Sequence, residues 1–382
     1  RLDFGFDGVF DPFTIDDVYS YSGDFGFITN SKPERDSTSF YGQGTWNHSD
    51  SLRTVFGLRH TKDEVYSAVT NFYGRSGTDI LETDGNKVTG RLVVEKDIDD
   101  NTMVYGSFTR GYKPGGSNLT YGREDEVAQI VVLPTFQEEI VDAFEVGLKT
   151  DLADGRARLN AAAFLYNYEG LQYQATDPEV FEGGVGNIPD SEIYGAELEL
   201  STFLSDSVIL DLRMSWLDTE ITADHLALDN VESEAATNAL LGQGIGLFSN
   251  EVQIARAGRI QNVRGNELAK TPSFTGNVAL NWTNEQNWGE LKGTLQYTYR
   301  GGFKHRIFNN SQTDIVPNYD VLDIMLGFYP SSAENQHFEI IGKNLFDQDG
   351  INARFTDVFG VGATGDELIA PRQIMLRFVT QF

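Results

Sequence analysis

The sequence contains no cysteine among its 382 residues, which excludes disulfide frameworks, thiolate zinc sites and cysteine nucleophiles. It also has no run close to the roughly 20 apolar residues that a membrane-spanning helix needs, and stretches such as 130–133 are far too short. Basic residues are scarce: 29 Lys and Arg stand against 57 Asp and Glu, giving a net charge of -28. Because phosphate backbones are bound by an excess of Lys and Arg, we expect no nucleic-acid partner.

The start of the chain also lacks a charged, apolar leader. Residues 1–10 already alternate like a strand, so we expect a processed or truncated chain. What is plentiful is glycine (39), phenylalanine (26) and tyrosine (16), which suit turns and strands. Composition therefore favours a β protein.

Apolar residues recur at every second position in several segments, a period that fits strands and does not fit helices. In 274–283 one face carries Phe274, Gly276, Val278, Leu280 and Trp282, and polar residues carry the other. Segments 194–200, 208–216 and 291–300 alternate in the same way. The pattern predicts about fourteen strands, beginning near Leu2, Ser39, Leu52, Lys87, Thr102, Val141, Arg156, Ser191, Val208, Pro272, Leu291, Asn318, His337 and Arg372.

The connections between these strands alternate between short and long. The short turns are 48–51, 97–101, 151–155, 205–207, 284–289 and 330–336. The long loops are 61–86, 111–140, 170–190, 222–271, 301–317 and 346–371, with a short helix expected at Val231 to Leu241. A barrel in an outer membrane has short periplasmic turns and long external loops. We therefore predict one all-β domain over residues 1–382, a transmembrane antiparallel up-and-down β-barrel.

Alternation also assigns side chains to the two faces of the predicted wall. The interface aromatics expected on the lipid face are Trp46, Trp282, Phe328 and Phe382 near the short turns, and Trp216 and Tyr299 near the long loops. The lumen is expected to be lined by Glu145, Glu197, Glu199, Asp211 and Arg213. Outer-membrane lipid and lipopolysaccharide are the surrounding partners that this arrangement implies.

Several motifs could suggest other chemistry, and their context argues against each. Gly360 to Gly365 matches a dinucleotide fingerprint in letters, but only the closing strand follows it. The five histidines have no metal-ligand spacing, and Glu124 to Glu126 is better read as solvated surface charge than as a calcium site. The paired glutamates at 197 and 199 have no water-excluding site around them. We predict no enzyme activity, no cofactor and no metal site.

The last strand resembles the closing strand of bacterial outer-membrane proteins, since Ile374, Leu376, Phe378 and Phe382 share one face. The terminal aromatic of such strands is read by the barrel assembly machinery. Further segments resemble TonB-dependent outer-membrane receptors and follow in that family's order: Gly57-Leu-Arg59, Arg110-Gly-Tyr-Lys-Pro-Gly-Gly116, Phe144-Glu-Val-Gly-Leu-Lys149, Ile193-Tyr-Gly-Ala-Glu-Leu-Glu199, Gly342-Lys-Asn-Leu-Phe-Asp347 and Ala370-Pro-Arg372.

This resemblance implies a barrel of about twenty-two strands around an N-terminal plug with a TonB box. The sequence shows neither plug nor box. We therefore expect the C-terminal portion of a larger barrel, with a possible second chain completing it, and the TonB system acting through the absent plug. The implied function is active uptake of a scarce small-molecule ligand, with ferric siderophore as the default. A passive pore, or a structural barrel within a larger membrane assembly, is the alternative.

Ligand contacts are expected in the external loops, where cations and aromatic rings could bind an anionic or aromatic ligand. The candidates are Tyr112, Tyr121, Arg256, Arg259, Arg264, Phe303, Lys304, His305 and Arg306. Binding of these cations to lipopolysaccharide phosphates or to acidic neighbours is the competing interpretation.

Overall fold

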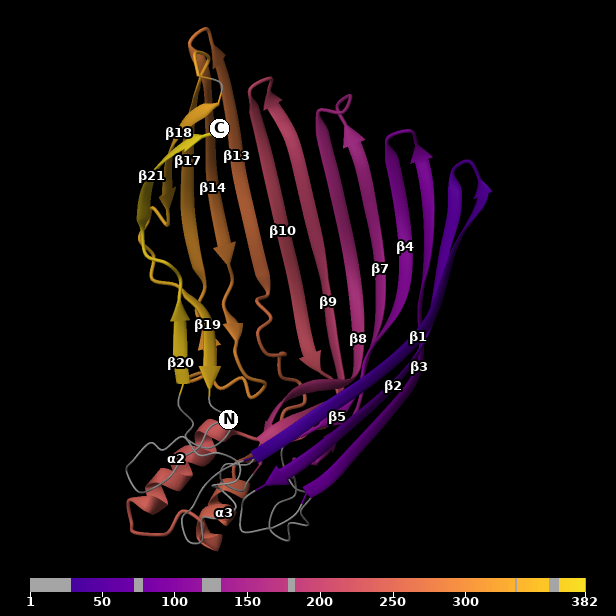
Figure 1. Cartoon of the computed structure of the whole chain (residues 1–382), viewed down its shortest axis with the longest axis vertical. Coiled ribbons are helices and arrows are strands. Elements are labelled where there is room, and N and C mark those ends of the chain that lie inside the picture. The colour runs from indigo at the N-terminus through magenta and orange to yellow at the C-terminus, as the bar shows by residue number, and fades with distance from the viewer. Residues whose placement is uncertain are drawn as a thin grey trace.

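The structure is a computed structural model that describes residues 29–71, 78–118, 132–177, 183–333, 335–356 and 364–381. Its main element is one antiparallel sheet of thirteen strands, in which each strand pairs with the next along the chain (Figure 1). The strands are β1 (Thr29–Ser49), β2 (Leu52–Asn71), β3 (Thr78–Asp99), β4 (Thr102–Lys113), β7 (Glu139–Leu152), β8 (Ala157–Thr176), β9 (Gly183–Ser205), β10 (Val208–Ile221), β13 (Phe274–Gln286), β14 (Gly289–Arg300), β17 (Tyr319–Pro330), β18 (Gln336–Lys343) and β21 (Gln373–Thr380).

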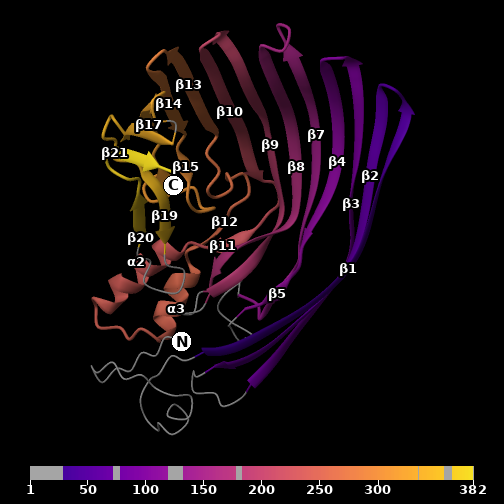
Figure 2. The ribbon, with the colours of Figure 1, turned by 45° about the horizontal axis from the view of Figure 1, so that its top comes forward.

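The predicted all-β antiparallel fold is confirmed, and these thirteen strands match the predicted strands from Ser39 onward. The strand predicted near Leu2 lies outside the described residues. The sheet curves into a trough that stays open between β1 and β21, two strands that do not pair with each other in the part of the chain described (Figures 1 and 2).

Two predicted loops are largely strand, so the sequence analysis was wrong about them. β2 runs on to Asn71 and β3 resumes at Thr78, while β8 runs to Thr176 and β9 starts at Gly183. The backbone ladder continues in both segments. In 61–71 the apolar period is lost because charged side chains occupy both faces, Asp63 on one and Lys62 and Glu64 on the other. Lys62 and Glu64, for example, are exposed and 2.5 Å apart. Pattern reading detects a strand by its apolar face, so it stops where that face ends.

All the short turns lie at one end of the trough and the long connections at the other (Figure 1). At the short end, the β7–β8 turn holds Ala153, Asp154 and Gly155 at positive φ of 51°, 56° and 82°, which matches the right-handed strand twist. At the β13–β14 turn, Gly289 has φ 148°, and a Cβ there would lie 2.4 Å from the Tyr329 carbonyl oxygen. The expected separation of short and long connections is therefore present.

In the part of the chain that the structure describes, the long-loop end carries four two-stranded sheets and two helices. The sheets pair β5 (Gly116–Ser117) with β6 (Thr135–Phe136), β11 (Leu226–Leu228) with β12 (Ile260–Asn262), β15 (Phe303–Lys304) with β16 (Ile315–Val316), and β19 (Ile351–Thr356) with β20 (Thr364–Leu368). Helix α2 (Asn230–Leu241) confirms the expected helix, and α3 (Asn250–Ala257) was not predicted. No described helix is long and apolar enough to cross a bilayer. We call these elements and their connections the external layer.

The external layer contains the hydrophobic cluster of the molecule, formed by Ile188, Ile221, Ala227, Val263, Leu268 and Ile307. Among the described residues, the long wall of the trough has no comparable cluster of buried hydrophobic side chains. Its apolar side chains stay exposed, such as Leu376 at 82% and Val146 at 62%. An apolar face this extensive needs an apolar environment.

Candidate functional site

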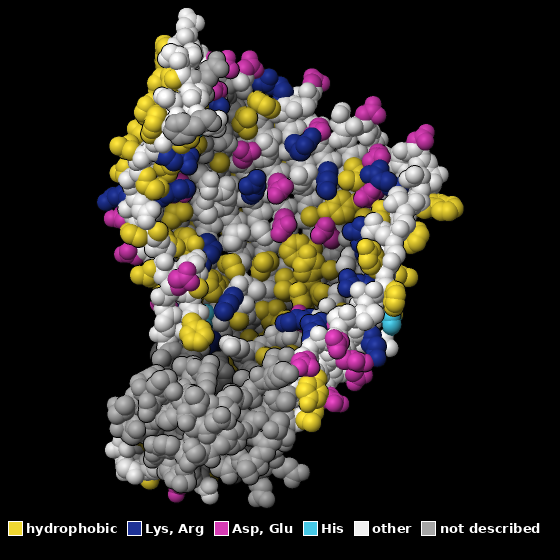
Figure 3. All heavy atoms as spheres, in the orientation of Figure 1, with side chains coloured by type: hydrophobic (Ala, Val, Ile, Leu, Met, Phe, Trp, Pro, Cys, Tyr) yellow, Lys and Arg dark blue, Asp and Glu magenta, His cyan; other side chains and the backbone are white. Residues whose placement is uncertain are grey.

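The inner face of the trough is polar, and the strand register defines it. Arg213 on β10 lies opposite Glu199 on β9 and Asn277 on β13, and Asp211 is two residues along the same strand. Glu197 and Glu145 lie on this face of β9 and β7. The structure therefore brings the five predicted lumen residues onto one face. Contact between this face and a plug stays a prediction. Figure 3 looks into the trough and shows acidic and basic side chains scattered over its wall.

Most charges on this face are paired with charges on neighbouring strands. Arg53 lies 2.5 Å from Glu95 and 3.0 Å from Asp97, and Lys343 lies 2.8 Å from Asp323. Arg377 and Glu339 form a further pair. Glu145 accepts a 2.6 Å hydrogen bond from the Tyr105 hydroxyl, and Arg213 and Glu199 are 3.9 Å apart. Such a wall suits water or a polar protein surface as its neighbour, because lipid would leave these groups unsolvated.

The opposite face is apolar and ends in aromatic rings. Trp46 is 64% exposed and Trp216 is 47% exposed, and the Trp216 ring lies 5.9 Å from that of Tyr194. Near the short turns, the Trp288 and Phe328 rings are 5.5 Å apart. The register pairs Val208 with Trp282, so the two rims are eight residues apart along β10. At about 3.3 Å per residue and a tilt of about 40°, the two aromatic rims are about 20 Å apart along the axis of the trough.

The predicted interface residues lie on this face, except Phe382, which is outside the described residues. Trp282 and Phe328 are near the short turns, and Tyr299 lies beside Phe274 near the long loops, with ring centres 6.0 Å apart. The rings at both rims suit the headgroup regions of a membrane.

In the external layer, Arg306 is buried and fully engaged with protein partners. Its guanidinium donates to Asp229 at 2.6 Å, to Asp314 at 2.7 Å and to the Asn230 side chain at 2.7 Å. Asp229 also caps α2 by accepting from Val231 and Glu232. Because Asp229 and Asp314 belong to different loops, Arg306 holds the 222–271 and 301–317 loops together. It serves as a structural cross-link, so its role as a ligand contact stays a prediction.

Arg256 makes a comparable link from α3. Its side chain is 1% exposed and donates to the Asp177 carbonyl oxygen at 3.3 Å, with Glu234 3.5 Å away. Burial lowers the pKa of this guanidinium. The Asp177 carboxylate accepts from the backbone N–H of Val132 at 2.8 Å. Asp177 thus joins the end of β8 to the β4–β7 and β10–β13 loops.

The other predicted ligand residues differ in their surroundings. Arg259 and Arg264 are exposed, and Arg264 is 3.6 Å from Asp224. Phe303 and Lys304 are half-buried in β15, with Phe303 4.8 Å from the Arg300 guanidinium. Tyr112 is half-buried at the end of β4, and Tyr121 lies outside the described residues. The structure therefore distributes these residues over the layer and does not gather them at one point.

Sequence reasoning missed the side chains whose hydrogen bonds and ion pairs hold the external layer together. Asn118 is 4% exposed and acts like a strand peptide: its amide donates to the Val185 carbonyl at 2.9 Å and accepts from the Val185 N–H at 2.8 Å. Arg354 forms a two-pronged pair with Asp366 at 2.6 and 2.8 Å. Val185 is 67 positions from Asn118, and Asp366 is 12 positions from Arg354 across the β19–β20 pair, so local spacing marks neither residue.

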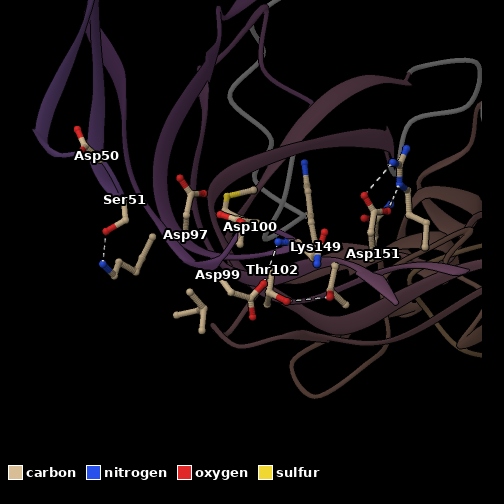
Figure 4. Close-up of a pocket in the computed structure, with 15 residues that line it drawn as sticks. Asp50, Ser51, Asp97, Asp99, Asp100, Thr102, Lys149 and Asp151 are labelled. Atoms are coloured by element: carbon tan, nitrogen blue, oxygen red, sulfur yellow. Dashed lines mark hydrogen bonds and ion pairs between the residues drawn. The ribbon is translucent and has the colours of Figure 1, made fainter. Parts of the chain in front are cut away.

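At the opposite end, the short turns enclose a pocket of about 880 Å³ (Figure 4). Its lining includes Asp97, Asp99 and Asp100 from the β3–β4 turn together with Lys149. Most of its polar groups already have partners, such as Asp151 with Arg158 at 2.7 Å and Lys96 with Ser51 at 2.6 Å. Across the described residues, no group of three or more His, Cys, Asp or Glu side chains is arranged to hold a metal ion.

Comparison with known proteins identifies the family to which this chain belongs. Residues 1–345 match the TonB dependent receptor-like, β-barrel family. The chain belongs to the TonB-dependent receptor family. A relative in this family is the probable TonB-dependent siderophore receptor PiuA of Acinetobacter baumannii. It is 27% identical over 168 residues, which are 44% of this chain and 21% of PiuA.

Solved receptors share the fold of this TonB-dependent receptor barrel. The ferric yersiniabactin uptake receptor FyuA of Yersinia pestis matches with a TM-score of 0.70 and 18% identity, over 93% of this chain and 47% of FyuA. The PiuA structure matches with a TM-score of 0.68 and 18% identity, over 91% of this chain and 43% of PiuA. The chain thus spans less than half the length of these receptors.

A pH-sensitive group lies inside the external layer of this receptor-family barrel. Burial lowers the pKa of His305 from 6.5 to about 4, and Arg306, Arg354 and Lys270 act in the same direction against Asp314. The stability that neutral His305 contributes is therefore complete above pH 6.5 and lost as the pH falls through about 4. We expect protease cleavage of the layer to rise across this window, and to rise less in His305→Asn. Identical pH profiles for both proteins would contradict this prediction.

Proposed function

We propose that this chain forms part of the wall of a plugged barrel in the bacterial outer membrane, and that the whole receptor takes up a scarce ligand from outside. The observation that carries the proposal is the division of one curved sheet into an apolar outer face with aromatic rims and a polar inner face with paired charges. Membership of the TonB-dependent receptor family supports energised uptake. The siderophore receptors named above make a ferric siderophore the first ligand to test.

The described residues would supply thirteen strands of this barrel, and the remaining strands and the plug would come from other residues of the receptor. Support comes from the open edges: within the described residues, β1 pairs only with β2, and β21 only with β18. Strand edges in a membrane need backbone partners, since each unpaired peptide group in lipid costs several kcal/mol. The inner carboxylates Glu145, Glu197, Glu199 and Asp211 would then face the plug, and Arg213 would join them.

The remaining proposed partners follow from the same arrangement. The outer face would contact lipid and, at the loop end, lipopolysaccharide. The strand that ends the chain would be read by the barrel assembly machinery, and TonB would act through the plug. No catalytic role is proposed for the paired charges of the inner face.

Uptake of an iron-loaded siderophore by cells that make the complete receptor tests this function. We expect accumulation of radioactive iron that requires both the receptor gene and TonB, and that falls to background when either is deleted. A receptor with Lys113→Gln, which changes an exposed cation at the end of β4, serves as the control and should take up iron like the unmodified receptor. Uptake that persists unchanged without TonB would contradict the proposal and favour a passive pore.

A further inference from the structure

The external layer encloses a second pocket, and its lining departs from the composition of the chain. The pocket has a volume of about 410 Å³ and lies between the ends of β8 and β9 and the three long loops that follow β10, β14 and β18. A volume of this size suits a small organic ligand. Tyr168 and Leu171 line it from β8, and Leu268, Lys270 and Phe308 line it from the loops.

No Asp or Glu is among the 23 described residues that line this pocket, whereas Lys270, Arg306, Arg354 and His305 are. The whole chain carries 57 Asp and Glu in 382 residues, so a lining of average composition would hold about three. The nearby carboxylates do not line the pocket. Asp229 and Asp314 pair with Arg306, and Asp366 pairs with Arg354. The pocket wall is therefore selectively free of negative charge.

Of the three Lys and Arg side chains in this lining, only Lys270 has no ion pair with a carboxylate among the described residues. Arg306 is committed to Asp229 and Asp314, and Arg354 to Asp366. The ammonium of Lys270 is exposed and has no carboxylate within ion-pair distance among the described residues. An unpaired cation at the mouth of an acid-free pocket attracts anions.

The backbone at Lys270 adds a second observation. Lys270 has φ 63°, a left-handed conformation that residues with side chains rarely adopt, and its N–H donates to the Lys304 carbonyl at 2.7 Å. Glycine would fit this position with less strain. The chain instead places a long cationic side chain there, which is the pattern of a functional constraint.

Aromatic rings form the other part of the pocket. Tyr168, Phe308 and Phe355 contribute to the lining, and the Phe355 side chain is 62% exposed. Leu268 and Ile307 of the hydrophobic cluster form an apolar floor. A planar ring could stack on these surfaces while its charge stays at the rim near Lys270.

We propose that this pocket binds an aromatic anion, a ring that carries a carboxylate or phenolate, with Lys270 holding the charge and the aromatic side chains holding the ring. The inference rests on the proposed function, because the pocket belongs to the end from which the receptor would take its ligand. It deepens that function by assigning a chemical class to at least part of the ligand.

Equilibrium binding of 2-naphthoate to the complete receptor in detergent micelles, followed by the fluorescence of the ligand, tests the proposal. We expect saturable binding that weakens about tenfold or more for the neutral 2-naphthamide and for Lys270→Gln, since each loses a charge-assisted contact. Lys270→Arg should restore most of the affinity. Lys113→Gln, which removes an exposed ammonium that does not line the pocket, should bind like the unmodified receptor.

Equal affinity of Lys270→Gln and unmodified receptor for 2-naphthoate would overturn the proposal, as would equal binding of the acid and its amide or no saturable binding at all. Circular dichroism of each variant verifies that the strands are folded. This measurement needs neither TonB nor iron. Failure here would therefore leave TonB-dependent uptake intact, and failure of uptake would leave the binding result intact.

Discussion

An arginine in place of Val278 is expected to destabilise the receptor by about 2–4 kcal/mol, which corresponds to a loss of about 30-fold or more in the folding equilibrium constant. Val278 lies on the outer face of β13, halfway between the rim residues Phe274 and Trp282 of the same strand. The side chain is therefore placed near the middle of the bilayer, where a guanidinium loses its hydration. The cost can be measured by denaturant unfolding of the receptor in liposomes.

The matched control is Gln296→Arg on the neighbouring strand β14. Gln296 lies opposite Ala279 and Asp323 on the inner face, at nearly the same depth. An arginine there meets water and a carboxylate, so we expect a change within about 1 kcal/mol, as for an ordinary exposed substitution. A similar cost for both variants would show that the two faces do not differ in solvent.

Replacement of Arg306 by Met is expected to destabilise the external layer locally while the strands of the wall stay folded. Asp229 and Asp314 are 1% and 0% exposed, so loss of the guanidinium leaves two buried carboxylates without their cation. Breaking a buried ion pair from one side costs about 3–5 kcal/mol. Helix α2 should suffer directly, because Asp229 is its N-cap.

Hydrogen exchange followed by mass spectrometry separates these effects. In Arg306→Met, peptides from α2, α3 and the 301–317 loop should lose protection, while peptides from β8, β9 and β10 retain theirs. Arg259→Gln is the control, since Arg259 is an exposed arginine of the 222–271 loop, which also contains α2 and α3. Unchanged protection of α2 in Arg306→Met would contradict the assignment of Arg306 as the link between loops.

The wall could be predicted from the sequence because a strand with one face toward lipid has apolar residues at every second position. The run from Val208 to Trp216, for example, fixes both the strand and the face. The same logic failed beyond Thr61, where polar residues such as Asp63 and Ser67 are buried on one face of β2, and Lys62 and Glu64 are exposed on the other. The apolar period disappears there. Alternation of apolar residues therefore cannot predict strand ends that have no apolar face.

The external layer could not be predicted because its contacts join residues that are far apart in sequence. Arg306 was singled out for its charge, yet two of its partners, Asp229 and Asn230, lie more than 70 positions away. The acid-free pocket is likewise formed by segments from the end of β8 to the loop after β18. Composition identified scarce cations correctly, but only the fold shows which of them are neutralised and that Lys270 is not.

The most direct test of the two-faced wall uses the absence of cysteine, since single cysteines can be placed at 294–298 on β14 without any background thiol. Each is labelled with an environment-sensitive fluorophore in the receptor reconstituted with brominated lipid, and quenching by lipid is compared with quenching by iodide. We expect lipid to quench positions 295 and 297, and iodide to quench positions 294, 296 and 298. Equal quenching by iodide at all five positions would contradict the account.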